Sequence, residues 1–180
     1  MPDEVEELKE MAEKGGHDPI LKPVSLTMAI LAVFVATVSL LGHRAHTEEL
    51  LFQNKATDNW AYYQAKNIRL HTYELFLDMV SLSDPKNQQL AEQVKEKYKK
   101  EIGRYRGELK EIEAEARKLE EETALEGRKA NRFDLGEVFL EIALVVTSIT
   151  LLTRRRLYWG MGLLAGVAGL GTALTGFLVH

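Results

Sequence analysis

Two glutamates stand inside an otherwise apolar run and are the first candidates for chemistry. Glu137 and Glu141 lie one helical turn apart in LGEVFLEIALVVTSITLLT, residues 135–153. A carboxylate at membrane depth is costly, so such a residue is a candidate for a functional role. If several copies formed a ring, these two side chains could line a path for protons or cations. The alternative is an interfacial polar cluster in the outer half of the helix, which His43 and His46 could face.

Evidence for a metal site or an enzyme is weak. The His43-x-x-His46 pair supplies only two of the ligands that a zinc site needs, and the chain has no cysteine. No nucleophile motif, phosphate-binding loop or metalloprotease helix is recognisable in the chain. We therefore expect no metal, no cofactor and no enzymatic activity.

A third candidate is the aromatic stretch NKATDNWAYYQAKN, residues 54–67. One interpretation is a small-molecule or cation site lined by Asp58, Tyr62 and Gln64. The other interpretation, which we favour, is that the aromatic residues of the stretch pack between two helices. The three aromatic residues are Trp60, Tyr62 and Tyr63.

Three apolar segments must hold these residues in place. Residues 24–42 and 157–179 contain no charged residue, and residues 135–153 contain only the two glutamates. A hydrocarbon core of about 30 Å needs roughly 20 helical residues, so each segment is predicted to be a transmembrane helix. The acidic residues 1–23 do not resemble a basic cleaved leader. We expect them to form a cytoplasmic tail and linker.

The polar insert, residues 43–134, is predicted to be helical. It has no glycine between residues 43 and 102 and a single break at SLSDPKNQ. Ser83 or Asp84 can cap a helix there, and Pro85 suits its first turn. The fold class is therefore an all-α membrane protein with three transmembrane helices and a long extramembrane antiparallel coiled-coil hairpin.

The first helix of the insert has two apolar lines. One follows a 4-3 spacing typical of a coiled-coil seam, from Leu51 to Leu82. The other line contains Ala56, Trp60, Tyr63, Leu70 and Leu77, whereas the second helix has one main line, from Ala91 to Leu119. The second helix can cover one side only, so we expect a second copy of the chain to cover the other, since most oligomers are symmetric homo-oligomers. The predicted oligomer seam includes Asn54, Asp58, Ala61, Ala65 and Ile68, of which Asn54 and Asp58 would set the register.

Small residues recur along the third apolar segment. Gly162, Gly166 and Gly169 are spaced for close approach between helix backbones in lipid. The spacing leaves two alternatives open. The glycines pack either against the other two transmembrane helices of the same chain or against another subunit.

Charge distribution predicts the orientation in the membrane. Arg154, Arg155 and Arg156 form the short connection between the last two apolar segments, and such a basic turn is typical of the cytoplasmic side. The N-terminus is then cytoplasmic, and the insert and the C-terminus are extracytoplasmic. The inverted orientation is the alternative. No strongly basic patch exists, so we expect no nucleic-acid partner.

The run N-K-A-T-D-N-W-A-Y-Y-Q-A-K, the charged helical insert and the C-terminal pair joined by T-R-R-R resemble a family of uncharacterised bacterial membrane proteins, known as a domain of unknown function. The resemblance covers residues 24–179, and D-x-W-A-Y-Y-Q-A-K is its specific part. It implies a bacterial origin and the three-helix layout, and it implies no activity.

Together these features predict a non-enzymatic, homo-oligomeric protein of the bacterial inner membrane that acts as a scaffold or as an accessory subunit of a larger membrane complex. Its expected partners are the lipid bilayer, other copies of itself and other membrane-complex subunits. The alternative is a cation or proton channel or transporter that uses Glu137 and Glu141. An enzyme is the third and most distant alternative.

Overall fold

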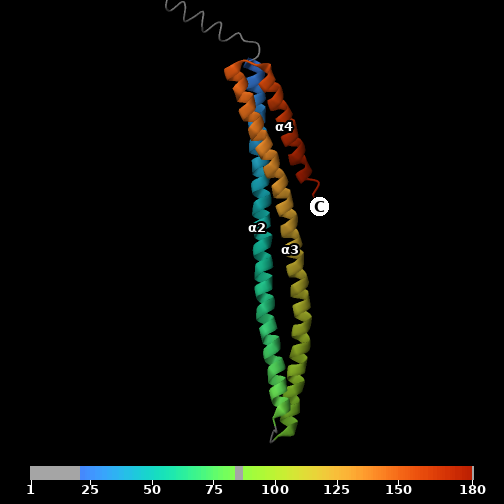
Figure 1. Cartoon of the computed structure of the whole chain (residues 1–180). Helices are drawn as coiled ribbons and strands as arrows, with labels where there is room; N and C mark the ends of the chain where they lie inside the picture. The colour runs from blue at the N-terminus through green and yellow to red at the C-terminus, as the bar shows by residue number, and fades with distance from the viewer. Residues whose placement is uncertain (1–20, 84–86, 180) are drawn as a thin grey trace, which may run out of the picture. The chain divides into compact units, whose positions relative to one another are not determined.

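The computed structural model describes residues 21–83 and 87–179, and these residues form three helices and no strand. The helices are α2 (Leu21–Leu82), α3 (Gln88–Thr153) and α4 (Arg156–Gly176), as Figure 1 shows. The chain divides into two compact units. Residues 1–46 and 127–180 form one, which we call the three-helix unit, and residues 47–126 form the other, the two-helix unit. The all-helical prediction is confirmed, whereas most of the predicted tail 1–23 lies outside the described residues.

Helix α2 is a single helix of 62 residues that contains both the first apolar segment and the first helix of the insert. Pro23 lies in its first turn, where the missing N–H group has no intrahelical partner to lose. The Thr27 hydroxyl donates a hydrogen bond to the Pro23 carbonyl at 2.8 Å.

Helix α3 begins at Gln88, three residues later than the predicted start at Pro85. The cap is Asn87, whose side-chain Oδ1 accepts a hydrogen bond from the Leu90 backbone N–H at 3.1 Å. The prediction that Ser83 caps this helix is wrong, because its hydroxyl donates to the Val80 carbonyl at the end of α2 instead. The alternative cap Asp84 and the first-turn Pro85 lie outside the described residues.

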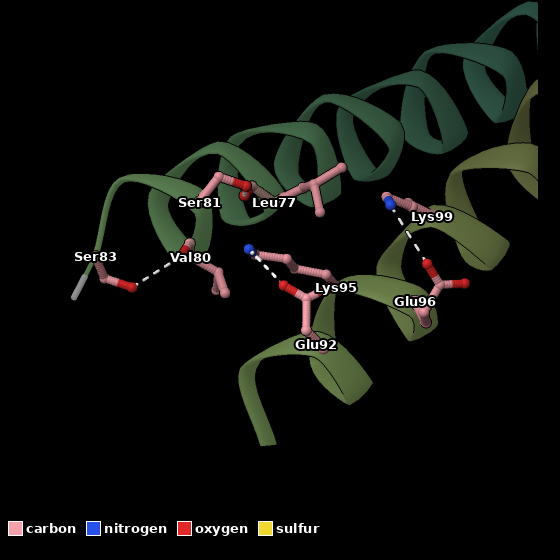
Figure 2. A network of polar contacts seen from close by, with 8 residues as sticks. All are labelled: Leu77, Val80, Ser81, Ser83, Glu92, Lys95, Glu96 and Lys99. Carbon is pink, nitrogen blue, oxygen red and sulfur yellow. Dashed lines mark hydrogen bonds and ion pairs between the residues drawn. The ribbon is translucent and has the colours of Figure 1, made fainter. Parts of the chain in front are cut away.

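Near the end of α2 and the start of α3, the polar contacts of Figure 2 join residues that are close in sequence. Figure 2 shows Lys95 paired with Glu92 at 3.0 Å and Lys99 paired with Glu96 at 3.3 Å, both within α3. Figure 2 draws no dashed line between α2 and α3. Pairs of this kind stabilise a helix by only a few tenths of a kcal/mol, about 0.2–0.5 each, so packing must hold α2 and α3 together.

The core of the two-helix unit is formed by apolar and aromatic side chains from both helices. Leu70 of α2 packs with Ile102, Tyr105 and Leu109 of α3, and Tyr63, Tyr73 and Leu77 pack around them. All members of the apolar line predicted on α3 are buried or half-buried: Ala91, Val94, Tyr98, Ile102, Tyr105, Leu109, Ile112, Ala116 and Leu119.

The three-helix unit has a core of its own, drawn from α2, α3 and α4: Leu31, Val38, Ala45, Ala130, Phe133, Leu140, Ala143 and Ala173. Each of the three described helices contains a window long and apolar enough to cross a membrane. The predicted segments 24–42 and 135–153 lie within α2 and α3, and α4 ends at Gly176, before the end of the predicted segment 157–179.

The connection between α3 and α4 is a tight turn. Arg154 adopts a left-handed conformation with φ of 55°, and its backbone N–H donates to the Thr150 carbonyl at 2.8 Å. Arg155 is extended, with φ −97° and ψ 119°. A non-glycine residue in the left-handed region costs of order 1 kcal/mol, which the packing of the two flanking helices offsets.

Candidate interaction surface on α2

One face of α2 is covered by α3 within the two-helix unit. Ala56 and Leu70 are buried, and Trp60, Tyr63 and Leu77 are half-buried. The Trp60 indole N–H donates a hydrogen bond to Glu120 Oε1 at 2.8 Å, and the rings of Trp60 and Tyr63 meet edge-to-face at 5.6 Å. This covered face is the second apolar line of the insert.

The opposite face of α2 is uncovered. Its positions follow the 4-3 spacing and lie roughly half a turn around the helix axis from the covered face. All ten side chains are exposed, and we call them the α2 seam: Leu51, Asn54, Asp58, Ala61, Ala65, Ile68, Thr72, Leu75, Met79 and Leu82.

The half of the α2 seam nearer to residue 82 is strongly apolar. Ile68 is 66% exposed and Leu75 is 61% exposed, and Met79 and Leu82 are also exposed. Large apolar side chains exposed singly are ordinary, but a contiguous apolar stripe marks an interaction surface. The regular spacing suits an α-helical partner that packs knobs into holes.

The half of the seam nearer to residue 51 contains two polar side chains. Asn54 and Asp58 are exposed, and within residues 21–83 and 87–179 neither side chain has a hydrogen bond or an ion pair. Lys55, three residues before Asp58, directs its ammonium group over the Phe52 ring at 5.5 Å. The carboxylate of Asp58 therefore stands on the seam without a neutralising cation.

Tyr62 lies outside the aromatic packing of Trp60 and Tyr63. Its side chain is 51% exposed, and its ring lies 5.2 Å from the ammonium nitrogen of Lys66. Asp58 and Gln64 are exposed as well. A cation from solution would compete with the chain's own Lys66 for the Tyr62 ring, which argues against the alternative of a cation site at these residues.

Charged pairs tie α2 to α3 along the covered face. Lys66 pairs with Glu108, and Glu74 pairs with Arg106 at 2.7 Å. The hydrogen bond from Lys66 lowers the pKa of Glu108, against a smaller raising effect of desolvation. The hydrogen bond from Arg106 likewise lowers the pKa of Glu74. These groups link the two helices and leave the seam free for other contacts.

His43 and His46 of the three-helix unit have partners close by. His43 Nδ1 lies 2.8 Å from the Ser39 carbonyl oxygen, one turn earlier in α2. His46 Nε2 lies 3.0 Å from Asp134 Oδ2 of α3. Among the described residues, no group of three or more His, Cys, Asp or Glu side chains could hold a metal ion.

Glu137 and Glu141 face away from the core of the three-helix unit. Glu137 is half-buried and Glu141 is exposed, whereas the buried positions of this part of α3 include Gly136, Leu140 and Ala143. Neither glutamate has a hydrogen bond or an ion pair in the part of the chain that the structure describes. The two carboxylates therefore line no path inside one copy, and an ion path would have to form between copies.

The predicted small-residue positions of α4 are buried inside the chain. A Cβ atom at Gly162 would clash with the Thr147 hydroxyl and lie 3.0 Å from the Ala143 carbonyl oxygen. A Cβ at Gly166 would lie 2.9 Å from Leu31 Cδ2, and one at Gly169 would lie 2.9 Å from the Gly136 carbonyl oxygen. These distances place the three glycines in contacts with α2 and α3 of the same chain.

Gly136 and Thr147 of α3 also line the contact with α4, and sequence reasoning missed both. A Cβ at Gly136 would lie 2.8 Å from the Ala173 Cβ. The fully buried Thr147 hydroxyl has no hydrogen-bond partner among the described residues, and its contact with Gly162 suits a weak Cα–H···O interaction. The signal was the regular spacing of Gly136, Ala143 and Thr147 along one face of residues 135–153.

Fold and surface together define an all-helical protein with three helices long and apolar enough to cross a membrane. Residues 20–179 match the model of the family described as Domain of unknown function (DUF4337), and the chain belongs to that family. No curated protein and no solved structure matches the chain.

Proposed function

We propose that this chain is a non-enzymatic, homo-oligomeric scaffold of the bacterial inner membrane, or an accessory subunit of a larger membrane complex. The three apolar segments 24–42, 135–153 and 157–179 would cross the bilayer. The two-helix unit would form an extracytoplasmic antiparallel coiled-coil hairpin. The N-terminus would be cytoplasmic, and the C-terminus extracytoplasmic, because Arg154, Arg155 and Arg156 favour the cytoplasmic side.

The observation that carries the proposal is the α2 seam. One face of α2 is covered by α3, and the opposite face repeats a coiled-coil spacing with every position exposed. A second copy of the chain supplies a matching face. Copies inserted in one bilayer share one orientation, so two α2 seams meet in parallel and in register, as in a cyclic oligomer. Asn54 and Asp58 of one copy then face the same residues of the next.

Disulfide cross-linking tests this assembly directly, because the chain has no native cysteine. In parallel, in-register helices, Ala65 of two copies comes within the Cα–Cα range of a disulfide, about 4.4–6.8 Å. We expect Ala65→Cys to give cross-linked dimers in native membranes under mild oxidation. The matched control is Ala114→Cys, an alanine on α3 of the same unit that is also exposed, which should stay monomeric.

Equal cross-linking of the two variants, or none in either, would contradict the seam as the contact. Native mass spectrometry of the detergent-solubilised chain then gives the copy number. A monomer would refute the homo-oligomer, and the exposed seam would need a different protein, which affinity purification from the membrane would identify.

A channel or transporter is the second candidate, and one observation favours it. Glu141 exposes a carboxylate within an apolar segment, where an unneutralised charge is costly. In an oligomer, Glu137 and Glu141 could face a shared water-filled path. Proton or cation flux into liposomes should then fall in the Glu137→Gln/Glu141→Gln variant, whereas the scaffold alone predicts unchanged assembly and no flux in either protein.

A further inference from the structure

A groove lies along one side of the two-helix unit, between α2 and α3. Its volume is about 520 Å³, which is within the range of small-molecule sites, about 300–1,000 Å³. We call it the α2–α3 groove. Two apolar side chains line it, Leu77 of α2 and Ile102 of α3. Ile102 is buried in the core of this unit and Leu77 packs against the same core, so the apolar lining is held in place.

Gly103 leaves the groove open. It belongs to the lining, and a Cβ atom added to it would meet no atom within 4 Å. A glycine inside a helix is destabilising relative to alanine, and here the missing side chain leaves space next to Ile102. A larger side chain at this position would project into the groove.

Charges of opposite sign line the two sides of the groove. Glu74 and Asp78 lie one helical turn apart on α2, whereas Lys99 and Arg106 lie on α3. Figure 2 labels one lining residue from each helix, Leu77 and Lys99. The α2 side repels a simple anion and the α3 side repels a simple cation. A small molecule that carries both charges meets an opposite charge on each side.

The pair between Glu74 and Arg106 holds the guanidinium at the groove. Arg106 Nη2 donates to Glu74 Oε1 at 2.7 Å, and Glu74 Oε2 lies 3.1 Å from His71 Nδ1, so both carboxylate oxygens of Glu74 are engaged. A guanidinium has five N–H donors, and the Arg106 side chain is 64% exposed. Arg106 can therefore bind the carboxylate of a ligand with donors other than the one that Glu74 takes.

Lys99 and Asp78 supply the other two polar contacts. Lys99 Nζ lies 3.3 Å from Glu96 Oε1 within α3, and both of these side chains are more than half exposed. An exposed pair of this kind contributes little to stability, so the Lys99 ammonium can turn to a ligand carboxylate at small cost. Asp78 is exposed on the α2 side, where its carboxylate can accept hydrogen bonds from a ligand ammonium group.

We propose that the α2–α3 groove is a binding site for a small zwitterion, an α-amino acid with an aliphatic side chain. Asp78 binds the ammonium group, and Arg106 and Lys99 bind the carboxylate. The aliphatic side chain lies against Leu77 and Ile102, in the space that Gly103 leaves. All lining residues belong to the two-helix unit of one copy, so the inference goes beyond the proposed function and depends neither on oligomerisation nor on membrane insertion.

Saturation-transfer difference NMR on the full-length chain in detergent tests the site, with L-leucine as the probe. Two analogues each lack one charge: leucinamide has no carboxylate, and N-acetyl-leucine has no ammonium group. Loss of one charge-assisted contact should weaken binding about tenfold or more. No signal from L-leucine, or equal dissociation constants for the three compounds, would overturn the proposal.

Two glycine variants locate the site. Gly103→Leu fills the groove and should abolish binding of L-leucine. The matched control is Gly107→Leu, because Gly107 is also exposed, lies one turn further along α3 and has no atom within 4 Å of an added Cβ, but does not line the groove. It should bind L-leucine like the parent protein. Both variants should melt at or above the parent temperature, since leucine favours a helix more than glycine does.

A third variant assigns the ammonium contact. Asp78→Asn should weaken L-leucine about tenfold and leave the affinity for N-acetyl-leucine unchanged, since that analogue has no ammonium group. Equal binding of L-leucine by the two glycine variants, or an equal loss in both, would refute the groove as the site. An unchanged affinity for L-leucine in Asp78→Asn would refute the zwitterion as the ligand class.

Discussion

Replacing Leu75 by serine should weaken association between copies and leave the fold of one copy nearly as stable. Leu75 is 61% exposed on the α2 seam, so the substitution removes little from the packing of one copy. Full burial of a leucine side chain contributes about 1.5–3 kcal/mol. Burial of the exposed part would therefore contribute about 1.5 kcal/mol per copy, or about 3 kcal/mol per pair of copies. The dissociation constant of a pair should rise about 100-fold in Leu75→Ser.

Sedimentation velocity of the full-length chain in detergent measures this dissociation constant, and circular dichroism melts report the stability of the fold. The contrasting variant is Leu70→Ala on the covered face. Leu70 is 6% exposed and packs against Ile102, Tyr105 and Leu109, so its truncation should lower the unfolding free energy by about 2–5 kcal/mol. An unchanged dissociation constant in Leu75→Ser, with Leu70→Ala destabilised as expected, would refute the seam as the contact between copies.

Three further predictions concern other contacts. Asp58→Asn should strengthen association by up to about tenfold if the copies are parallel, because it removes like charges that face each other; a loss of association would indicate a basic partner instead. Gly162→Leu should destabilise the packing of α4 by about 1–3 kcal/mol, while Gly160→Leu, with open space around its Cβ position, should melt near the wild-type temperature in detergent. Because the hydrogen bond from Lys66 lowers the Glu108 pKa, the stabilisation from this carboxylate is complete above its unfolded pKa of about 4.3 and disappears as the pH falls through the folded value. Glu108→Gln should therefore flatten the dependence of melting temperature on pH below about pH 4, and a parallel pH profile would show that the pair contributes nothing.

The helices and their covered faces could be predicted from the sequence because hydrophobic periodicity reports which side of a helix is buried. The line from Ala91 to Leu119 and the line containing Ala56 and Leu70 are both buried or half-buried. Helix α3 ends at Thr153, the last residue of the second apolar segment. Spacing of this kind depends on local chain geometry alone, so it needs no knowledge of a partner.

Contacts between distant segments were harder to predict. Ser83, Asp84 and Asn87 are all good caps by residue type, so the sequence alone does not choose among them. The structure shows that Asn87 caps α3. The partner of His46 is Asp134 rather than a second ligand for a metal, and residue types alone do not pair side chains 88 positions apart. The sequence likewise did not show whether Gly162 packs within the chain, because a small residue permits close approach by a helix but does not identify which helix.

The polar pairs that join α2 to α3 in the two-helix unit have a consequence for the order in which the chain folds. Trp60 and Glu120 are 60 residues apart, Lys66 and Glu108 are 42 apart, and Glu74 and Arg106 are 32 apart. The entropy lost on closing a loop grows with its length, so the pair nearest the connection should form first and the more distant pairs should follow in sequence. Folding would then proceed as a zipper from the connection between α2 and α3. A weakened Glu74–Arg106 pair would slow folding, whereas a weakened Trp60–Glu120 pair would mainly speed unfolding.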